Sequence, residues 1–367
     1  MKRQALILIP FALALVVGCQ KAPLKIAVLA SLGGAQEGAQ LAIDEWNARG
    51  GVLGRQIIMV MKGTGVDDVD SAVEAAEDVI TKDHASYIIG DIFSSLSIAI
   101  SEVANAAKVI QITPTSTVAA VTLDRRGAPK PYVFRACFDD ATQGRLAASF
   151  AVRNLKARKA FIMVDPTNVY ISDLADIFSA SFTRLGGAVA GTARYSVTDT
   201  DFTETLARIR SARPDLVYLP AISLQIVNIV TQQAREKGIT ATFMGGDGWD
   251  DASLDARAAD GSYFTTHYRP DDPRPEAQAF VKAYRAKYAD APNFAAALSY
   301  DTANLLLAAI RNAGVDNTDA VRAALEKISL DGITGTIAMN AQHTPLKGVV
   351  VEHVTGGKVA FDSYISP

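Results

Sequence analysis

The sequence predicts an α/β protein made of two doubly wound, parallel-sheet lobes that are joined by more than one crossing of the chain. Three observations support this prediction. The chain has 367 residues, and chains longer than about 250–300 residues usually divide into more than one core. Short apolar runs alternate with segments of helical periodicity, as in parallel sheets covered by helices on both faces. An aromatic content of only 7% and 26 glycines suit tight turns and closely packed layers.

The first part of the chain alternates regularly between strand and helix patterns. The opening run Lys25–Ala30 is apolar and ends near Gly33 and Gly34, and apolar residues then recur at helical spacing from Ala39 to Trp46. The alternation continues with expected strands at Gln56–Met61, Ser86–Gly90 and Val109–Thr113, and with expected helices at Val69–Thr81 and Ser94–Ala107.

A second array of the same kind follows a proline-containing stretch at Gly127–Pro131. Its expected strands are Ala160–Val164, Ala188–Tyr195, Leu216–Leu219 and Thr242–Met244, and its expected helices are Asp173–Leu185, Phe202–Ala212 and Ser223–Lys237. After this array the sequence pattern predicts helices at Pro275–Tyr288, Ala295–Ala313 and Asp319–Ile328, and short strands at Thr336–Met339, Val349–Val354 and Lys358–Ile365. Terminal helices and strands of this kind allow the chain to return to each lobe in turn.

The chain begins with a segment typical of a signal peptide. A positive start is followed by the apolar run Ala5–Val17, which is shorter than the roughly 20 residues that a membrane-spanning helix needs. Gly18 directly before Cys19 resembles a bacterial lipobox. We therefore expect residues 1–18 to be removed and Cys19 to carry a lipid anchor in the periplasm or at the cell surface. Cleavage by ordinary signal peptidase, with Cys19 incidental, is the alternative.

Charge and cysteine content exclude two further classes of protein. The sequence holds 36 Lys and Arg against 39 Asp and Glu, a net charge of -3, without a basic block that could follow a phosphate backbone. Nucleic acid is therefore not an expected partner. Cys19 and Cys137 are the two cysteines. Lipidation of Cys19 would leave no disulfide, and Cys137 is then expected to be a small buried hydrophobic residue.

Signatures of enzymes are missing from the sequence. It has no G-x-S-x-G, Walker G-x-x-x-x-G-K-S/T, H-E-x-x-H or C-x-x-C motif. The loop Gly33–Gly38 lacks the dinucleotide-binding spacing, and Lys62 stands where an acidic residue would be expected. Catalytic residues, a cofactor and a metal site are therefore not predicted. Each histidine is expected to face solvent or to make a single hydrogen bond, with none at metal-ligand spacing: His84, His267, His343 and His353.

Two polar loops follow expected strands of the first array, where ligands bind in open α/β sheets. Ser94 and Ser95 come after the third strand, at the N-terminus of a helix, whose unpaired N–H groups and positive dipole end suit a carboxylate. An ordinary serine N-cap is the alternative. Thr115, Ser116 and Thr117 come after the fourth strand and can turn their hydroxyls toward the same point, although they could also form a simple polar loop.

In the second array, Asp247 follows the strand Thr242–Met244 and lies between two glycines. A carboxylate at this strand end, facing the other lobe, can bind an ammonium group, and Trp249 offers an apolar or cation–π wall beside it. Asp247 could also be a turn residue, whereas the spacing of the nearby aspartates does not match a calcium loop. Hydroxyls on one lobe and a carboxylate on the other predict a two-ended clamp for a zwitterion.

Several motifs, in a fixed order, carry a resemblance to a known family. They are Gly38–Arg55, Ile112–Pro114, Val133–Arg135, Phe243–Trp249, Phe280–Tyr284 and Tyr300–Asp301. Over nearly the whole mature chain, the sequence resembles the substrate-binding proteins of branched-chain amino acid ABC transporters, the leucine/isoleucine/valine-binding type of periplasmic binding protein. The resemblance implies a type I periplasmic binding protein-like fold with a multi-strand hinge. Lobe 1 would comprise residues 19–138 and 268–347, and lobe 2 residues 139–267 and 348–367.

The resemblance also implies roles for individual residues. Ser94 corresponds to the serine that holds the ligand carboxylate, and Asp247 to the acidic residue that receives its ammonium. Tyr170 corresponds to a tyrosine of the second lobe that closes over the ligand. Three departures put leucine as the ligand in doubt. The first loop is short and lacks a ligand-contacting aromatic residue, Ile222 stands near the position of a second pocket tyrosine, and a disulfide found near Phe93 in some relatives is missing.

These inferences together predict an extracytoplasmic solute-binding lipoprotein. It would close its lobes around a small amino acid-like ligand and deliver that ligand to the permease subunits of an ABC importer, touching the membrane through the lipid on Cys19. A ligand sensor of the same fold, which presents its closed state to a receptor, is the alternative. An α/β enzyme is disfavoured by the missing motifs.

Overall fold

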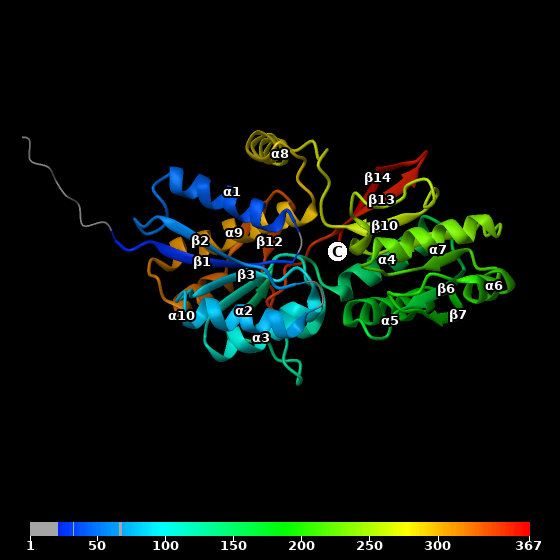
Figure 1. Cartoon of the computed structure of the whole chain (residues 1–367), viewed down its shortest axis with the longest axis horizontal. Helices are drawn as coiled ribbons and strands as arrows, with labels where there is room; N and C mark the ends of the chain where they lie inside the picture. Colours follow the sequence, from blue (N-terminus) through cyan, green and yellow to red (C-terminus); the bar gives the residue numbers. More distant parts are fainter. Residues whose placement is uncertain (1–20, 32, 66–67) are drawn as a thin grey trace, which may run out of the picture.

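The computed structural model describes residues 21–31, 33–65 and 68–367. The predicted signal peptide, residues 1–18, and the predicted lipidation site, Cys19, lie outside them. In the described residues, the strands form a five-stranded sheet, a seven-stranded sheet and a two-stranded ribbon. The two larger sheets lie side by side along the long axis of the molecule (Figure 1). The predicted α/β class with two parallel-sheet layers is confirmed.

The first sheet is parallel throughout and has the order β2-β1-β3-β4-β5. Both faces are covered by helices, so β3 and β4 are buried at every position. Helices α1 and α9 pack on one face and α2 and α3 on the other, while α8 and α10 pack beside α1 and α9 (Figure 1). The elements are β1 (Leu24–Leu29), α1 (Ala35–Ala48), β2 (Ile57–Lys62), α2 (Val69–Thr81), β3 (Tyr87–Gly90), α3 (Ser94–Ala106), β4 (Ile110–Thr113), β5 (Val133–Arg135), α8 (Pro275–Tyr288), α9 (Phe294–Ala313) and α10 (Thr318–Leu325).

The second sheet has the order β14-β13-β10-β9-β8-β6-β7. Its strands run parallel except for β13, which is antiparallel to both β10 and β14. One large cluster of buried apolar side chains fills the space between this sheet and its helices. The elements are α4 (Asp140–Arg153), β6 (Lys159–Val164), α5 (Val169–Arg184), β7 (Ala188–Arg194), α6 (Thr203–Ala212), β8 (Leu216–Tyr218), α7 (Leu224–Glu236), β9 (Thr242–Gly245), the 3₁₀ turn η2 (Asp247–Trp249), β10 (Tyr263–Thr266), β13 (Val349–Thr355) and β14 (Lys358–Ile365).

Several helices begin at side chains that suit the N-cap position. Asp68, Asp139, Asn168 and Asn293 each accept a hydrogen bond from a backbone N–H in the first turn of α2, α4, α5 and α9. Helix α9 is buried along most of its length and ends at Gly314, whose φ of 70° is readily adopted by glycine. In the described part of the chain, no helix is both long and apolar enough to span a bilayer.

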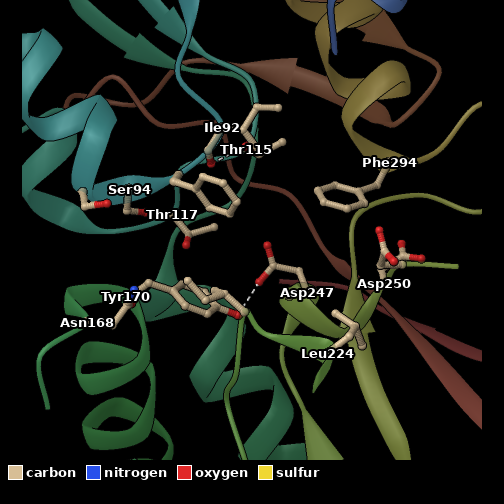
Figure 2. Close-up of a pocket in the computed structure, with 15 residues that line it drawn as sticks. Ile92, Ser94, Thr115, Thr117, Asn168, Tyr170, Leu224, Asp247, Asp250 and Phe294 are labelled. Carbon is tan, nitrogen blue, oxygen red and sulfur yellow. Dashed lines mark hydrogen bonds between the residues drawn. The ribbon is translucent and has the colours of Figure 1, made fainter. Parts of the chain in front are cut away.

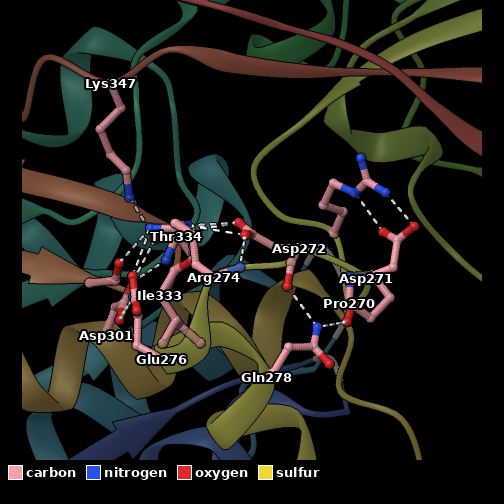
Figure 3. Close-up of polar contacts among 12 residues, drawn as sticks. Pro270, Asp271, Asp272, Arg274, Glu276, Gln278, Asp301, Ile333, Thr334 and Lys347 are labelled. Atoms are coloured by element: carbon pink, nitrogen blue, oxygen red, sulfur yellow. Dashed lines mark hydrogen bonds and ion pairs between the residues drawn. The ribbon is translucent and has the colours of Figure 1, made fainter.

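The described chain passes between the two large sheets in three places: after β5, after β10, and between β12 (Gly335–Ala338) and β13. The first crossing contacts both of the others. The Lys347 ammonium on the third crossing donates to the carbonyl of Ala136 on the first, at 3.2 Å. It also donates to the hydroxyl of Thr334 at 2.6 Å (Figure 3). The second crossing is tied to the first lobe by Arg274, which donates to the carboxylate of Asp272 and to the carbonyl of Ile333 (Figure 3).

Four elements were not predicted from the sequence pattern: β5, α4, β10 and β11 (Ser329–Gly332). Helix α4 was missed because its buried side includes the polar residues Asp140, Thr142 and Gln143, which interrupt the apolar period on which the prediction depends. The three strands have four residues or fewer, and polar or glycine residues interrupt their apolar runs: Arg135 in β5, Thr265 and Thr266 in β10, and Ser329, Asp331 and Gly332 in β11. Two of these elements, α4 and β10, contribute to the site described below.

Candidate ligand-binding site

A cleft between the two sheets forms the candidate site. It encloses about 730 Å³ of empty space, with the open solvent at its mouth included. Most lining residues follow the carboxyl ends of parallel strands, the edge at which ligands bind in open α/β sheets. The lining consists of Ile92, Phe93, Ser94 and Ser95 after β3, Thr115 and Thr117 after β4, Asn168 and Tyr170 after β6, Ile222 and Leu224 after β8, Asp247, Gly248, Asp250 and Asp251 after β9, and Phe294 at the start of α9.

The wall contributed by the first lobe offers hydroxyls and a helix N-terminus. Ser94 and Ser95 begin α3, and Phe93 precedes them without a side chain that could cap the helix. The first N–H groups of α3 therefore lack a capping partner and, with the positive end of the helix dipole, suit a carboxylate. Ser94 and Thr117 lie on the same side of the cleft in Figure 2, so the structure brings together the two loops that the sequence analysis paired.

A buried hydroxyl network fixes the shape of these two loops. The Thr113 hydroxyl donates to the carbonyl of Asp91 at 2.6 Å, and the Thr115 hydroxyl donates to the carbonyl of Ile92 at 2.6 Å. The Asp91 carboxylate accepts hydrogen bonds from the backbone N–H groups of Ile92, at 2.5 Å, and Phe93, at 3.0 Å. Because each loop hydrogen-bonds the other, the hydroxyl wall is held in one arrangement.

Ser116 belongs to this network and not to the cleft lining, contrary to its predicted place among the ligand-binding residues. Its hydroxyl lies 2.7 Å from the Ser97 hydroxyl and 3.0 Å from the carbonyl of Ile92, and the residue is 1% exposed. The hydroxyl, itself buried, finds its hydrogen-bond partners in the interior and not in the cleft.

Asp247 lies on the opposite side of the cleft and is 7% exposed. Its Oδ1 accepts a hydrogen bond from the Tyr170 hydroxyl at 2.7 Å (Figure 2). The same oxygen accepts from the Gln143 amide at 2.8 Å, and Oδ2 lies 2.9 Å from Nε2 of His267. Burial raises the pKa of Asp247. The hydrogen bond from His267, the charge of His267 when it is protonated at low pH, and the hydrogen bonds from Tyr170 and Gln143 outweigh burial and hold the pKa below its ordinary value. The carboxylate is therefore ionised at neutral pH.

Tyr170 is placed where the sequence analysis expected a residue that closes over the ligand. It lies in the first turn of α5, lines the cleft and donates its hydroxyl to Asp247. Burial raises the pKa of Tyr170 well above its ordinary value, and the neighbouring Asp247 raises it further. The phenol thus remains a neutral hydrogen-bond donor.

Trp249 was predicted to form a wall of the site, and the structure corrects this. The indole is fully buried and does not line the cleft. Its N–H donates to the carbonyl of Leu219 at 2.9 Å, and its ring packs near Phe264. Trp249 closes the one-turn helix η2, which directs its side chain into the core of the second lobe, while Asp247 of the same turn faces the cleft.

The electrostatic character of the lining is acidic. Asp247, Asp250 and Asp251 line the cleft, and no lysine, arginine or histidine is among the described lining residues. Burial raises the pKa of Asp250 to about 6, with the Thr266 hydroxyl acting in the opposite direction. Asp247 thus supplies a permanent negative charge at neutral pH, which favours a cationic group on the ligand.

Several residues of the site escaped the sequence analysis. Phe294 and Leu224 line the cleft from helix N-termini, and Gln143 and His267 contact Asp247 from behind it. Gln143 lies on the unpredicted helix α4, and His267 follows the unpredicted strand β10, so only recognition of these elements could have revealed them. His267 is 6% exposed and makes one hydrogen bond, which matches the expectation of a singly bonded histidine. In the described part of the chain, no cluster of potential metal ligands is present.

Comparisons with known proteins agree with this geometry. A family model described as "Periplasmic binding protein" matches residues 25–358. The chain is similar to the Leu/Ile/Val-binding protein BraC3 of Rhizobium johnstonii, with 30% identity over 311 residues that cover 83% of this chain and 82% of the relative.

Solved structures show the same similarity. The crystal structure of a leucine-binding protein, LivK, from Thermotoga maritima has a TM-score of 0.85 and 32% identity, and the match covers 94% of this chain and 99% of the other. The branched-chain amino acid transporter substrate-binding protein LivJ from Streptococcus pneumoniae, solved with isoleucine, has a TM-score of 0.84 and 28% identity, and the match covers 94% and 100% of the two chains. These relatives are solute-binding proteins and not enzymes, in agreement with the sequence analysis.

Proposed function

Because the chain belongs to the periplasmic binding protein family, we propose that it captures a small amino acid-like ligand in its cleft and delivers it to the permease of an ABC importer. Membership of this family implies an extracytoplasmic location. The relatives that are named for leucine, isoleucine and valine support an amino acid as the ligand.

The observation that carries the proposal is the pairing of an ionised, buried carboxylate with a hydroxyl-lined helix N-terminus across one cleft. The ammonium of an amino acid would pair with Asp247 beside the Tyr170 hydroxyl, and its carboxylate would accept hydrogen bonds from Ser94, Thr117 and the first N–H groups of α3. Phe93, Ile222, Leu224 and Phe294 would surround the side chain of the ligand. An apolar amino acid therefore fits the lining better than an acidic one.

The proposal includes a two-lobed mechanism. We assign residues 19–138 and 268–347 to lobe 1 and residues 139–267 and 348–367 to lobe 2, a division supported by the two large sheets and by the crossings between them. Since Ser94 and Thr117 belong to one lobe and Asp247 and Tyr170 to the other, a zwitterion bound to both favours the closed arrangement by its differential affinity. The closed protein would then be the form that the permease recognises.

The proposal also includes a lipid anchor at Cys19, supported by the sequence around the end of the predicted signal peptide. Expression of the full chain in a bacterium, followed by mass spectrometry of the N-terminal peptide, tests this part. A diacylglyceryl-modified Cys19 is expected. An unmodified N-terminus at another residue would contradict the anchor and leave the binding proposal intact.

A thermal-shift screen of the chain from Gln20 onward tests the ligand class. The panel comprises the twenty L-amino acids, small amides, and aromatic and aliphatic carboxylates. A ligand at 100 times its Kd adds about 2.7 kcal/mol to the free energy of unfolding, which moves the Tm of a protein of this size by a few degrees. A shift with one or more apolar L-amino acids is expected. Shifts confined to compounds without an amino group would contradict the role of Asp247.

A further inference from the structure

Two buried side chains that do not line the cleft contact Asp247. The amide nitrogen of Gln143, on α4, lies 2.8 Å from Oδ1 of Asp247 and 2.9 Å from the Thr265 hydroxyl. Nε2 of His267 lies 2.9 Å from Oδ2. Gln143 is fully buried and His267 is 6% exposed. The ligand-facing carboxylate is thus held from behind by residues that the cleft itself does not expose.

His267 acts in this arrangement as a neutral donor. Burial lowers its pKa below the ordinary value of 6.5, although Asp247 acts in the opposite direction. The ring is therefore neutral at pH 7, and the nitrogen that faces the ionised carboxylate, Nε2, carries the proton. The other ring nitrogen, Nδ1, is buried without a hydrogen-bond partner in the described chain, as suits an unprotonated nitrogen better than an N–H group or a charged ring.

The three donors to Asp247 are a phenol, an amide and a neutral imidazole, and none of them cancels its negative charge. A lysine or arginine in their place would neutralise the carboxylate and compete with a ligand's ammonium. Neutral donors fix the rotamer of the carboxylate and favour its ionised form, and they leave its full charge available to the cleft.

His267 also connects Asp247 to the hinge. It is the first residue after β10, on the second crossing. Its ring stacks on Phe138 of the first crossing, with the ring centroids 3.8 Å apart and an interplanar angle of 22°. The donor to the ligand-facing carboxylate is therefore fixed between two of the segments that join the sheets.

We propose that His267 and Gln143 are positioning residues that hold Asp247 ionised and oriented toward the cleft, with His267 tying that orientation to the hinge. This inference rests on the proposed function, because it assigns Asp247 the capture of an ammonium group.

The groups around His267 determine how its protonation depends on pH. Asp247 is hydrogen-bonded to it, and the charge of Lys347 on the third crossing opposes its protonation. Burial raises the pKa of Asp140 on α4, of Tyr170 on α5 and of Cys137 on the first crossing, so the Tyr170 phenol and the Cys137 thiol near Asp247 are neutral at pH 7. As the pH falls through the lowered pKa of His267, a positive charge appears beside Asp247 and repels a ligand's ammonium. Affinity for an amino acid then decreases.

Isothermal titration calorimetry with L-leucine as the probe, from pH 5 to pH 8, tests the proposal. His267→Phe keeps a ring that can stack on Phe138 but removes the donor, and we expect it to weaken binding by about 10- to 100-fold at pH 7.5. His267→Gln keeps an N–H donor that does not titrate. We expect it to bind within about fivefold of the wild type and to retain its affinity to a lower pH. Gln143→Leu should weaken binding by about tenfold.

The matched control is His353→Phe. His353 also stacks on an aromatic ring, that of Tyr263 at 4.2 Å, but it lies outside the lining of the cleft. This variant should bind L-leucine as the wild type does. Wild-type affinity in His267→Phe, or an equal loss in His267→Gln and His267→Phe, would overturn the positioning role of His267.

A second measurement separates this inference from the proposed function. Nitrogen-15 NMR titration of the histidines, without ligand, should show His267 neutral at pH 7 with the proton on Nε2. In Asp247→Asn, the pKa of His267 should fall further, because a neighbouring negative charge is removed. An unchanged pKa would overturn the inference. If wild-type protein fails to bind L-leucine while the NMR result holds, leucine as ligand is contradicted and the positioning of Asp247 stands.

Discussion

The Asp247 side chain shows how a single residue combines burial with charge. An isolated buried carboxylate becomes neutral, because the loss of hydration destabilises the ion. Here hydrogen bonds from Tyr170, Gln143 and His267 replace those of the lost water and keep the Asp247 carboxylate ionised. Asp140 provides a contrast. This carboxyl is also buried, and burial raises its pKa well above the ordinary value, although the Thr117 hydroxyl and the charge of Arg135 act in the opposite direction.

Removal of the Asp247 charge should abolish most amino acid binding. In Asp247→Asn, the ammonium of a bound amino acid would be buried without its carboxylate, and the dissociation constant should rise about 100-fold or more. Calorimetry with the amino acid that gives the largest thermal shift measures this. Asp176→Asn, an exposed position on α5, is the control and should bind normally. Equal affinities in the two variants would contradict the clamp.

Trp249 should matter for stability and not for direct contact with the ligand. Trp249→Phe removes a fully buried indole and leaves the carbonyl of Leu219 without its donor. We expect the free energy of unfolding to fall by about 2–3 kcal/mol, measured by urea denaturation. The dissociation constant of an amino acid ligand should change less than tenfold. A large loss of affinity with unchanged stability would show that Trp249 contacts the ligand directly.

Among the elements, α1 and α9 show how closely two helices can pack on one sheet. Gly38 faces the backbone of α9, and a Cβ atom at this position would overlap the carbonyl of Ala296. Small residues surround this contact in the first turn of α9, where Ala295, Ala296 and Ala297 are fully buried. Since Phe294 begins α9 and lines the cleft, the position of this helix also shapes the candidate site.

Substitution of Gly38 tests this packing. Alanine normally stabilises a helix by roughly 0.5–1 kcal/mol relative to glycine, but in Gly38→Ala the overlap with α9 should lower the free energy of unfolding by about 1–3 kcal/mol. Urea denaturation measures the difference. Gly63→Ala is the control, because a Cβ atom there would meet no atom of the described residues within 4 Å, and its stability should change by less than about 1 kcal/mol. A stabilised Gly38→Ala variant would show that α9 can move away.

At the scale of the whole molecule, the lobes are joined by three crossings that share buried polar contacts. Lys347 is 5% exposed and bridges the third crossing to the first through the carbonyl of Ala136. Burial lowers its pKa from 10.5 to about 8. Figure 3 places its ammonium beside Thr334, near the buried carboxylate of Asp301.

The Lys347 pKa predicts an unusual dependence of stability on pH. Between about pH 8 and pH 10.5 the unfolded chain binds more protons at this lysine than the folded chain, so its contribution to stability rises with pH. From pH 7 to pH 9.5 the wild type should gain about 1–2 kcal/mol relative to Lys347→Met. Urea denaturation at both pH values measures this difference. A difference that does not depend on pH would contradict the lowered pKa.

The sequence by itself determined the class of the fold and most of its elements. Apolar runs such as Lys25–Ala30 alternate with helical periods because both faces of each parallel sheet are covered, and this periodicity is local information. The sequence also indicated the cleft residues Ser94, Thr115, Thr117, Tyr170 and Asp247, because the carboxyl ends of parallel strands meet at one edge of a sheet, and in the case of Tyr170 through the family resemblance.

Only the tertiary structure decided which side chains of these loops face the cleft. Ser116 and Trp249 stand next to lining residues in the sequence, but buried carbonyls of Ile92 and Leu219 direct them inward. Gln143 and His267 contact one carboxylate although they are far apart in the chain. The physical reason is that a buried polar group must find its partner, and that partner is usually distant in sequence. Periodicity locates an element, but the satisfaction of hydrogen bonds decides its orientation.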